Sequence, residues 1–436
     1  MEKPKEEKKF IQKMKYRHAF QSRPSMIEEA PNPRTISTGA RNLGMVLLIL
    51  VFVEKIVSNV EKGEPMVDLH LLFHLTSGLI SVLFITFIMT VWCFNIFFIE
   101  KLLIKEVISE KIAYIVYSIS QIILFSVPTY FALTWNLSIV SRGSVSLQMA
   151  VYLMKTHSFF FTNRKRIKKK MNNEPEKKKN EEKKETKEEE AKSTKYKYEP
   201  SKNTVQHFTL FLLYPTLVYE QEYPRTKKRS WKSIAKYLSL MIGSFFLLYL
   251  NINYFMIPAF KEALEKNFIR IMIKLAVPSV LSWLLLFFGV FHCLLNLIAE
   301  FFMFADRKFY SDWWNAKTFD EFWNKWNTLV YEWFHRHIYL DSMTDMNIPR
   351  PLAMVLVFLV SALWHEFIIS TSFLFFRPYM AASMMGQFSV IYFTKIPFIR
   401  DSGLGNIVLW LCLTVGQSIV YIGYSLFYFS KFPIQN

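Results

Sequence analysis

Apolar residues in this chain come in long continuous blocks rather than in strict alternation with polar ones. A helix that crosses the hydrocarbon core of a bilayer needs about 20 mostly apolar residues. The pattern therefore predicts an all-α, polytopic membrane bundle and argues against a transmembrane barrel. The nine predicted spans are Leu43–Val60, Leu71–Ile99, Ile112–Ile139, Val145–Phe161, Ser233–Ile257, Leu275–Phe304, Pro351–Phe376, Tyr379–Phe393 and Asn406–Phe429. The fourth and eighth are short and carry polar residues, so either could be re-entrant or interfacial.

Two polar segments divide the chain into four parts. Residues 1–40 form a basic tail, residues 41–161 hold the first membrane helices, and residues 205–436 hold the remaining ones. Residues 162–204 are rich in Lys and Glu and cannot bury enough apolar area to offset chain entropy, so we expect a disordered loop. Of the net charge of +18, residues 1–35 carry +4 and residues 163–202 carry +7. Because Lys and Arg mark cytoplasmic segments, and four spans lie between them, both segments are predicted to be cytosolic.

The composition narrows the class of protein further. Hydrophobic residues make up 52% of the chain and aromatic residues 17%, which excludes an ordinary soluble enzyme. Three cysteines cannot form a disulfide scaffold for 436 residues. A nucleic-acid-binding protein can be basic but would not contain these apolar runs, so membrane lipid is the expected surrounding and no nucleic-acid partner is expected.

One predicted span contains an ionisable pair, His365-Glu366, within Val360–Phe367. Ionisable residues at this depth are costly and usually face a cavity or a partner. The alternative is a neutral histidine hydrogen-bonded to a neighbouring helix. The pair is not a zinc-protease motif, because position 369 is Ile rather than His, and no metal site is expected. Without a second ligand nearby, His365 is better interpreted as a general base.

A second motif, Phe309-Tyr-Ser-Asp-Trp-Trp-Asn315, precedes a stretch in which apolar side chains recur at helical spacing. Residues 316–339 therefore predict an amphipathic helix at the membrane interface, with most of the aromatic side chains as anchors. Asp312 and Asn315 are polar groups held among bulky rings. His335-Arg336-His337 is predicted to be interfacial and to face phosphate rather than to be catalytic.

These two motifs together resemble the membrane-bound O-acyltransferase family, in the branch that contains sterol and diacylglycerol O-acyltransferases. The resemblance implies a helical bundle around a buried reaction chamber, residence in the endoplasmic reticulum, and a homodimer or homotetramer. It implies that His365 is the catalytic histidine and that Asn315 is its polar companion. The side chains that we then expect to contact substrate are Asp312, Trp313, Trp314, Glu366, Gln387, Gln417 and His157.

The resemblance leaves the acceptor lipid open between two classes. Met154–Phe159, Tyr223–Thr226 and Phe304–Arg307 resemble the sterol enzymes. Met384–Gln387 and Val415–Gln417 resemble the diacylglycerol enzymes, whose chamber uses glutamines there. A sterol is the narrowly favoured acceptor, and diacylglycerol is the alternative.

The expected reaction needs no cofactor, because acyl-CoA is a co-substrate. A neutral imidazole accepts the proton of a lipid alcohol as its oxygen attacks the thioester carbonyl. Asn315 would hold acyl-CoA or donate to the developing oxyanion. A rival route passes through an acyl-cysteine at Cys93, Cys293 or Cys412. A rival outside enzymes is a lipid transporter, for which the Trp-Trp-Asn loop has no evident use.

Overall fold

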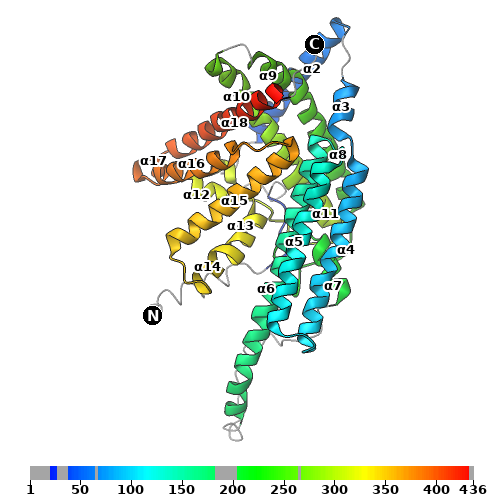
Figure 1. Ribbon diagram of the computed structural model, residues 1–436. Coiled ribbons are helices and arrows are strands. Elements are labelled where there is room, and N and C mark those ends of the chain that lie inside the picture. Colours follow the sequence, from blue (N-terminus) through cyan, green and yellow to red (C-terminus); the bar gives the residue numbers. More distant parts are fainter. Residues whose placement is uncertain (1–19, 27–37, 64–66, 182–203, 264–266, 432–436) are drawn as a thin grey trace.

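A computed structural model describes residues 20–26, 38–63, 67–181, 204–263 and 267–431, and these residues are mostly helical (Figure 1). In these ranges there is no β-sheet, only two isolated bridges, Arg23 with Asp306 and Arg225 with Phe304. The predicted all-α class is confirmed.

The helices of the first part are α2 (Thr38–Glu61), α3 (Leu69–Thr76), α4 (Leu79–Ile104), α5 (Glu110–Thr134) and α6 (Ile139–Glu181). Those that follow are α7 (Val205–Leu213), α8 (Trp231–Asn251), η1 (Ile252–Met256), α9 (Ile257–Ala263), α10 (Phe268–Phe287), η2 (Phe288–Leu294) and α11 (Leu295–Phe301). The last are η3 (Trp313–Asn315), α12 (Phe319–Trp326), α13 (Thr328–Phe334), η4 (His335–Leu340), α14 (Asp341–Thr344), α15 (Arg350–Phe373), α16 (Tyr379–Thr394), α17 (Pro397–Asp401) and α18 (Leu404–Lys431).

Six helical segments among the described residues are long and apolar enough to cross a membrane. They are Leu79–Ile104, Glu110–Thr134, Trp231–Ala263, Phe268–Phe301, Arg350–Phe373 and Leu404–Lys431. Each coincides with a predicted apolar run. The three further runs lie in α2, in α6 and in α16, which has only 16 residues. The total of about nine spans stays a prediction.

The helices form two packed groups that meet at α15. Helices α4, α5 and α6 lie side by side, and α10 packs against α8 and α18 (Figure 1). Helix α15 packs on α6 on one side and on α16 on the other. This places the His–Glu pair of α15 at the junction of the two groups.

The predicted Lys/Glu loop is shorter than its composition suggests. Helix α6 continues to Glu181 and extends away from the body of the molecule (Figure 1). The predicted loop boundary at residue 162 is therefore wrong, and residues 182–203 lie outside the described part. Lys, Glu and Arg are good helix formers, so a helix that is already nucleated by packing can continue through them.

Most of the aromatic residues between Trp313 and Phe334 pack inside the protein rather than at its outer surface. Trp313 and Phe319 are each 2% exposed, and Trp333 is 7% exposed. Trp326 of α12 stacks on Trp283 of α10 with 4.1 Å between ring centroids. The prediction that most of these rings are membrane anchors is wrong, since an amphipathic pattern does not show whether its apolar face meets lipid or protein.

Two contacts fix the loop that contains Asp312–Asn315. Asn406 of α18 donates from Nδ2 to the carbonyl oxygens of Trp314 and Ala316, each at 2.9 Å. Gly405 approaches the backbone of Lys317 so closely that a Cβ would clash with the Lys317 carbonyl oxygen. A glycine at this position therefore lets α18 dock directly against the end of the loop.

Of the predicted N-terminal tail, residues 20–26 are described, and they pair with the segment that precedes the loop. Arg23 donates to both carboxylate oxygens of Asp306, at 2.8 and 2.6 Å, and Asp306 is buried. The amide of Arg23 donates to the carbonyl oxygen of Ala305 at 3.1 Å. This part of the tail therefore has a structural role, because it binds the segment that leads into the loop.

Candidate active site

His365 lines a cavity of about 370 Å³ between α15 and the helices that follow the aromatic loop. From α15 and α16 the cavity is lined by Met354, Val357, Phe358, Ser361, His365 and Met384. From α12, α13 and η4 it is lined by Asp320, Trp323, Asn324, Trp326, Asn327, Val330, Tyr331, Phe334, His335 and Tyr339. The lining is mostly apolar with a few polar groups, which is typical of a small-molecule site.

The hydrogen bonding of His365 determines which ring nitrogen can act as a base. Its Nδ1 lies 2.8 Å from the carbonyl oxygen of Ser361, one turn earlier on α15. A carbonyl oxygen only accepts, so we assign the proton to Nδ1, which leaves the lone pair of a neutral ring on Nε2. No protein group in the described ranges pairs with Nε2. The geometry is that of a general base with its acceptor nitrogen available.

The opposite wall of the cavity is built from two short capped helices. Thr318 caps α12 by accepting from the amide of Glu321, and Asn327 caps α13 by accepting from the amide of Val330. A side chain at each start accepts a backbone N–H that has no partner within the helix. The break at Asn327 lets the chain bend around the cavity.

Gln387 fastens this wall to α16. The indole Nε1 of Trp323 donates to Oε1 of Gln387 at 3.0 Å, and the ring of Trp323 lies against Phe358 of α15. Gln387 is thus placed behind a cavity-lining residue. Gln417, on α18, is half-buried and does not line the cavity described above.

Glu366 faces away from the cavity and holds α16 in place. Its Oε2 accepts the amides of Met380 and Ala381, each at 3.1 Å, at the start of α16. The hydroxyl of Tyr424 donates to it at 3.0 Å, and Glu366 is buried. A carboxylate at a helix N-terminus satisfies unpaired N–H groups and interacts favourably with the helix dipole. Glu366 therefore orients the helix that supplies Met384 and Gln387.

The structure does not place the Asp312–Asn315 loop at the cavity. Asn315 is exposed, and Asp312 forms an ion pair with Lys325 at 3.0 Å. Trp313 is buried in the aromatic core, with Trp314 edge-on to it at 5.6 Å between centroids. The loop reaches the cavity only indirectly, through α12, which follows it.

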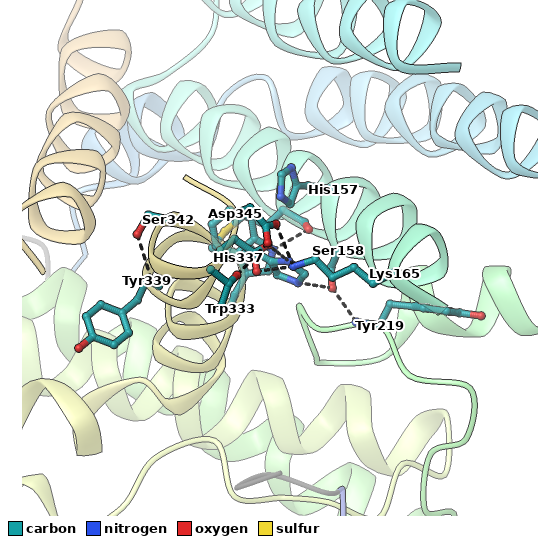
Figure 2. Close-up of polar contacts among 12 residues, drawn as sticks. His157, Ser158, Lys165, Tyr219, Trp333, His337, Tyr339, Ser342 and Asp345 are labelled. Carbon is teal, nitrogen blue, oxygen red and sulfur yellow. Dashed lines mark hydrogen bonds and ion pairs between the residues drawn. The ribbon is translucent and has the colours of Figure 1, made fainter. Parts of the chain in front are cut away.

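His157 lies in a second polar cluster, between α6 and η4. Its Nδ1 is 2.9 Å from the hydroxyl of Tyr117, and its ring centroid is 5.3 Å from that of His337. Next to it, Ser158 accepts the amide of Tyr219 at 2.9 Å and lies 2.8 Å from Nε2 of His337, as Figure 2 shows. None of these side chains lines the cavity of His365.

The three residues His335-Arg336-His337 have three different surroundings. His335 lines the cavity and stacks between Tyr331 and Tyr339, at 5.8 and 5.6 Å between centroids. Arg336 pairs with Glu220 at 2.6 Å. His337 is buried, and this burial, aided by the charges of His157, Lys165 and Arg336, holds its pKa well below the ordinary value.

Three further observations bear on the possible chemistry. Burial raises the pKa of Glu332, on α13, to about 7, against the opposing charge of Arg336. Within the described residues, no group of three or more His, Cys, Asp or Glu side chains could hold a metal ion. Cys93, Cys293 and Cys412 are not among the cavity-lining residues, so nothing in the described part brings a thiol to His365.

Sequence reasoning missed most of the cavity wall. The sequence pattern predicts membrane anchors or a phosphate-facing surface in the segment after the loop. In the structure, one face of that segment lines the cavity and carries Trp323, Tyr331, His335 and Tyr339. The signal available was their spacing, since 331, 335 and 339 recur every four residues and so lie on one side of a helix. The same spacing places Trp333 and His337 on the other side, toward α6.

Comparisons with known proteins agree with this architecture. The family model described as MBOAT, membrane-bound O-acyltransferase family, matches residues 69–426. The chain is 28% identical over 437 residues to diacylglycerol O-acyltransferase 1 of Dictyostelium discoideum, covering 98% of this chain and 67% of that protein. It is 26% identical over 442 residues to sterol O-acyltransferase 1 of Mus musculus, covering 96% and 76%. It is 34% identical over 232 residues to diacylglycerol O-acyltransferase 1 of Chlorocebus aethiops, covering 52% and 47%.

Proposed function

Because the chain belongs to the membrane-bound O-acyltransferase family and is an acyl-CoA O-acyltransferase, we propose that it esterifies a sterol with His365 as general base. One observation carries the assignment of the base. His365 lines the cavity, and its Nδ1 is held by the Ser361 carbonyl oxygen, so Nε2 is the nitrogen left to accept a proton. A base must reach the proton that it removes, and only a nitrogen at a cavity can reach the proton of a bound alcohol.

The proposed reaction is a direct transfer. Nε2 takes the proton of the lipid hydroxyl, and the oxygen bonds to the thioester carbonyl carbon. The carbon–sulfur bond then breaks, and the imidazolium returns the proton to the departing sulfur of coenzyme A. The thiol is a good leaving group, since an ordinary thiol has a pKa of about 8.5. No acyl-cysteine is needed, which agrees with the position of all three cysteines away from the cavity lining.

The other residues expected at the site take supporting roles in this proposal. Glu366 and Gln387 position α16 and Trp323, as their hydrogen bonds support. Asn315 and the adjoining Trp313-Trp314 stay proposed as contacts of acyl-CoA outside the cavity, which the exposure of Asn315 supports. A role for Gln417 or His157 in substrate binding rests on the resemblance alone.

Diacylglycerol is a second candidate acceptor. Relatives named for each activity match nearly the whole chain at similar identity. The sterol proposal is supported by the resemblance of Tyr223–Thr226 and Phe304–Arg307, which pair with each other in the structure. The diacylglycerol alternative is supported by Gln387, which reaches the cavity wall through Trp323.

One experiment tests the reaction and the acceptor together. The purified protein is given labelled oleoyl-CoA with cholesterol or with diacylglycerol in separate reactions, and the ester is identified by mass spectrometry. We expect cholesteryl ester from the wild type and none from His365→Ala. Leu363→Ala is the matched control, because Leu363 lies on the same helix and is 57% exposed on its outer surface. Triacylglycerol alone would establish the alternative acceptor, and full activity of His365→Ala would overturn the proposed base.

We also propose an endoplasmic reticulum location with a cytosolic N-terminus and a homodimer or homotetramer. The support is the family resemblance and the positive charge of the N-terminal tail. Light scattering of the purified protein, with the detergent contribution subtracted, gives the oligomeric state. A monomer would contradict the assembly proposed.

A further inference from the structure

A cluster of basic side chains surrounds the start of α8. We call residues 225–236 the basic segment; its cations are Arg225, Lys227, Lys228, Arg229, Lys232 and Lys236. No Asp or Glu occurs from Tyr223 to Lys261. In the described ranges, Arg225, Lys227, Lys228 and Lys232 are exposed and form no ion pair. These four side chains therefore form a concentrated positive surface with no ion-pair partner in the described part of the chain.

The position of the segment relative to the membrane follows from the helix that it begins. Trp231–Ala263 is a candidate span, and Trp231 is 67% exposed at its first residue. Exposed tryptophan is enriched where a span leaves the hydrocarbon and enters the headgroup layer. The cations next to Trp231, from Arg225 to Lys232, are therefore expected at the depth of lipid phosphates. A soluble partner would have to reach them through that layer, whereas lipid headgroups already surround them.

We propose that the basic segment binds the anionic headgroups of phospholipids in the leaflet around it. The supporting argument is charge complementarity between cations that lack a carboxylate partner and phosphate-bearing headgroups at the same depth. Clustered Lys and Arg also act as a topology signal during insertion. The binding proposal differs from that role because it concerns the folded protein and can be measured on it.

The backbone of the segment is tied to the chain that leads into the aromatic loop. The amide of Thr226 donates to the Met303 carbonyl oxygen and that of Ala305 to the Pro224 carbonyl oxygen, each at 3.0 Å. The amide of Ser230 donates to Glu300 at 2.6 Å, and Glu300 pairs with Arg307. A lipid held by this segment therefore stabilises a folded arrangement that extends to residue 307. A ligand that binds only the folded state raises the melting temperature.

Native mass spectrometry of the purified full-length protein in detergent tests the proposal. Phosphatidylserine and phosphatidylcholine with the same acyl chains are titrated in parallel. We expect the wild type to bind phosphatidylserine at least about tenfold more tightly, with a higher melting temperature in its presence. The variant Lys227→Gln/Lys228→Gln/Lys232→Gln should lose both effects. Equal binding of the two lipids by the wild type, or an unchanged preference in the variant, would overturn the proposal.

The control changes three lysines at another membrane edge. Lys101, Lys105 and Lys111 lie at the adjoining ends of α4 and α5, where Glu100, Glu106 and Glu110 balance them. The variant Lys101→Gln/Lys105→Gln/Lys111→Gln should keep the wild-type preference. Glycerophosphoserine, which lacks acyl chains, distinguishes a lipid from a free phosphate: equal affinity for it would contradict a lipid site. If the first variant does not fold, the wild-type protein is measured at low and at high salt. Its preference for phosphatidylserine must disappear at high salt if the binding is electrostatic.

Discussion

Two histidines of this protein make similar hydrogen-bond contacts and differ in what else surrounds them. His365 and His337 each have one ring nitrogen in a short polar contact, with the Ser361 carbonyl oxygen and with the Ser158 hydroxyl, both at 2.8 Å. At His365 the other nitrogen faces a cavity. At His337 the other nitrogen lies 3.9 Å from Asp341, with protein packed around it.

The difference is that the Ser158–His337–Asp341 grouping does not line the cavity of His365. Ser158 accepts the Tyr219 amide, and its hydroxyl can also donate to His337 Nε2. We assign this direction because it places the ring proton on Nδ1, the nitrogen that lies 3.9 Å from the Asp341 carboxylate. Ser158, His337 and Asp341 follow the order of a catalytic triad, but Nδ1 of His337 has no hydrogen-bond partner in the described part, and Ser158 is fully buried and does not line the cavity of His365. The contact between Ser158 and His337 links α6 to η4, and η4 supplies part of the cavity wall opposite His365.

The largest expected effect is a loss of activity without a loss of stability when His365 is replaced. His365→Ala should lower ester formation by about 10²–10⁴-fold, the usual contribution of a general base, with little change in melting temperature. Steady-state kinetics and thermal unfolding of the same preparation check this. A variant with wild-type activity would remove the distinction between the two histidines.

The next largest effect is expected at His337 and should appear as lost stability. His337→Ala leaves the Ser158 hydroxyl without its acceptor in a buried site, at a cost of about 1–3 kcal/mol in the free energy of unfolding. Activity should fall only as far as the folded fraction falls. The control is His337→Gln, whose amide oxygen can accept from Ser158. An inactive but fully stable His337→Ala would show that the second histidine takes part in the reaction.

Sequence reasoning identified His365 because an ionisable residue within an apolar run is a strong local signal. It predicted a substrate contact for His157 and a phosphate-facing surface for His337, because the burial of both depends on contact between α6 and η4, between residues that are 179 apart in the chain. It also assigned the aromatic rings of residues 313–334 to lipid, since a hydrophobic pattern is the same for either neighbour. The fold class followed directly from the apolar runs, whereas the cavity depends on how short helices bend at Asn327.

A smaller effect concerns the pH dependence of stability. The pKa of His337 lies below its unfolded value of about 6.5, so stability is lost as pH falls below that value, because unfolding then takes up a proton. Glu332 has the opposite sign: its pKa is raised to about 7, so stability is lost as pH rises from about 4.5 toward 7. We therefore expect Glu332→Gln to melt at a lower temperature at pH 5.5 than at pH 7.5.

The double variant Glu332→Gln/His337→Gln isolates the contribution of the histidine. Its melting temperature should change less between the two pH values than that of Glu332→Gln alone. Other groups that titrate in this range contribute equally to both variants, so they cancel in the comparison. Identical pH profiles for the two variants would show that His337 is not held uncharged by its surroundings.

The smallest expected effect tests whether the wall opposite His365 needs its link to α16. Trp323→Phe keeps the ring but removes the Nε1 donor to Gln387, and a neutral hydrogen bond contributes about 0.5–1.5 kcal/mol. We expect a few-fold lower kcat/KM. Gln387→Leu should behave similarly, and the double variant should be no worse than either single one if the two side chains act through this bond. Additive losses would mean instead that Gln387 acts on the substrate itself, as the resemblance to the diacylglycerol enzymes implies, and would favour diacylglycerol as the acceptor.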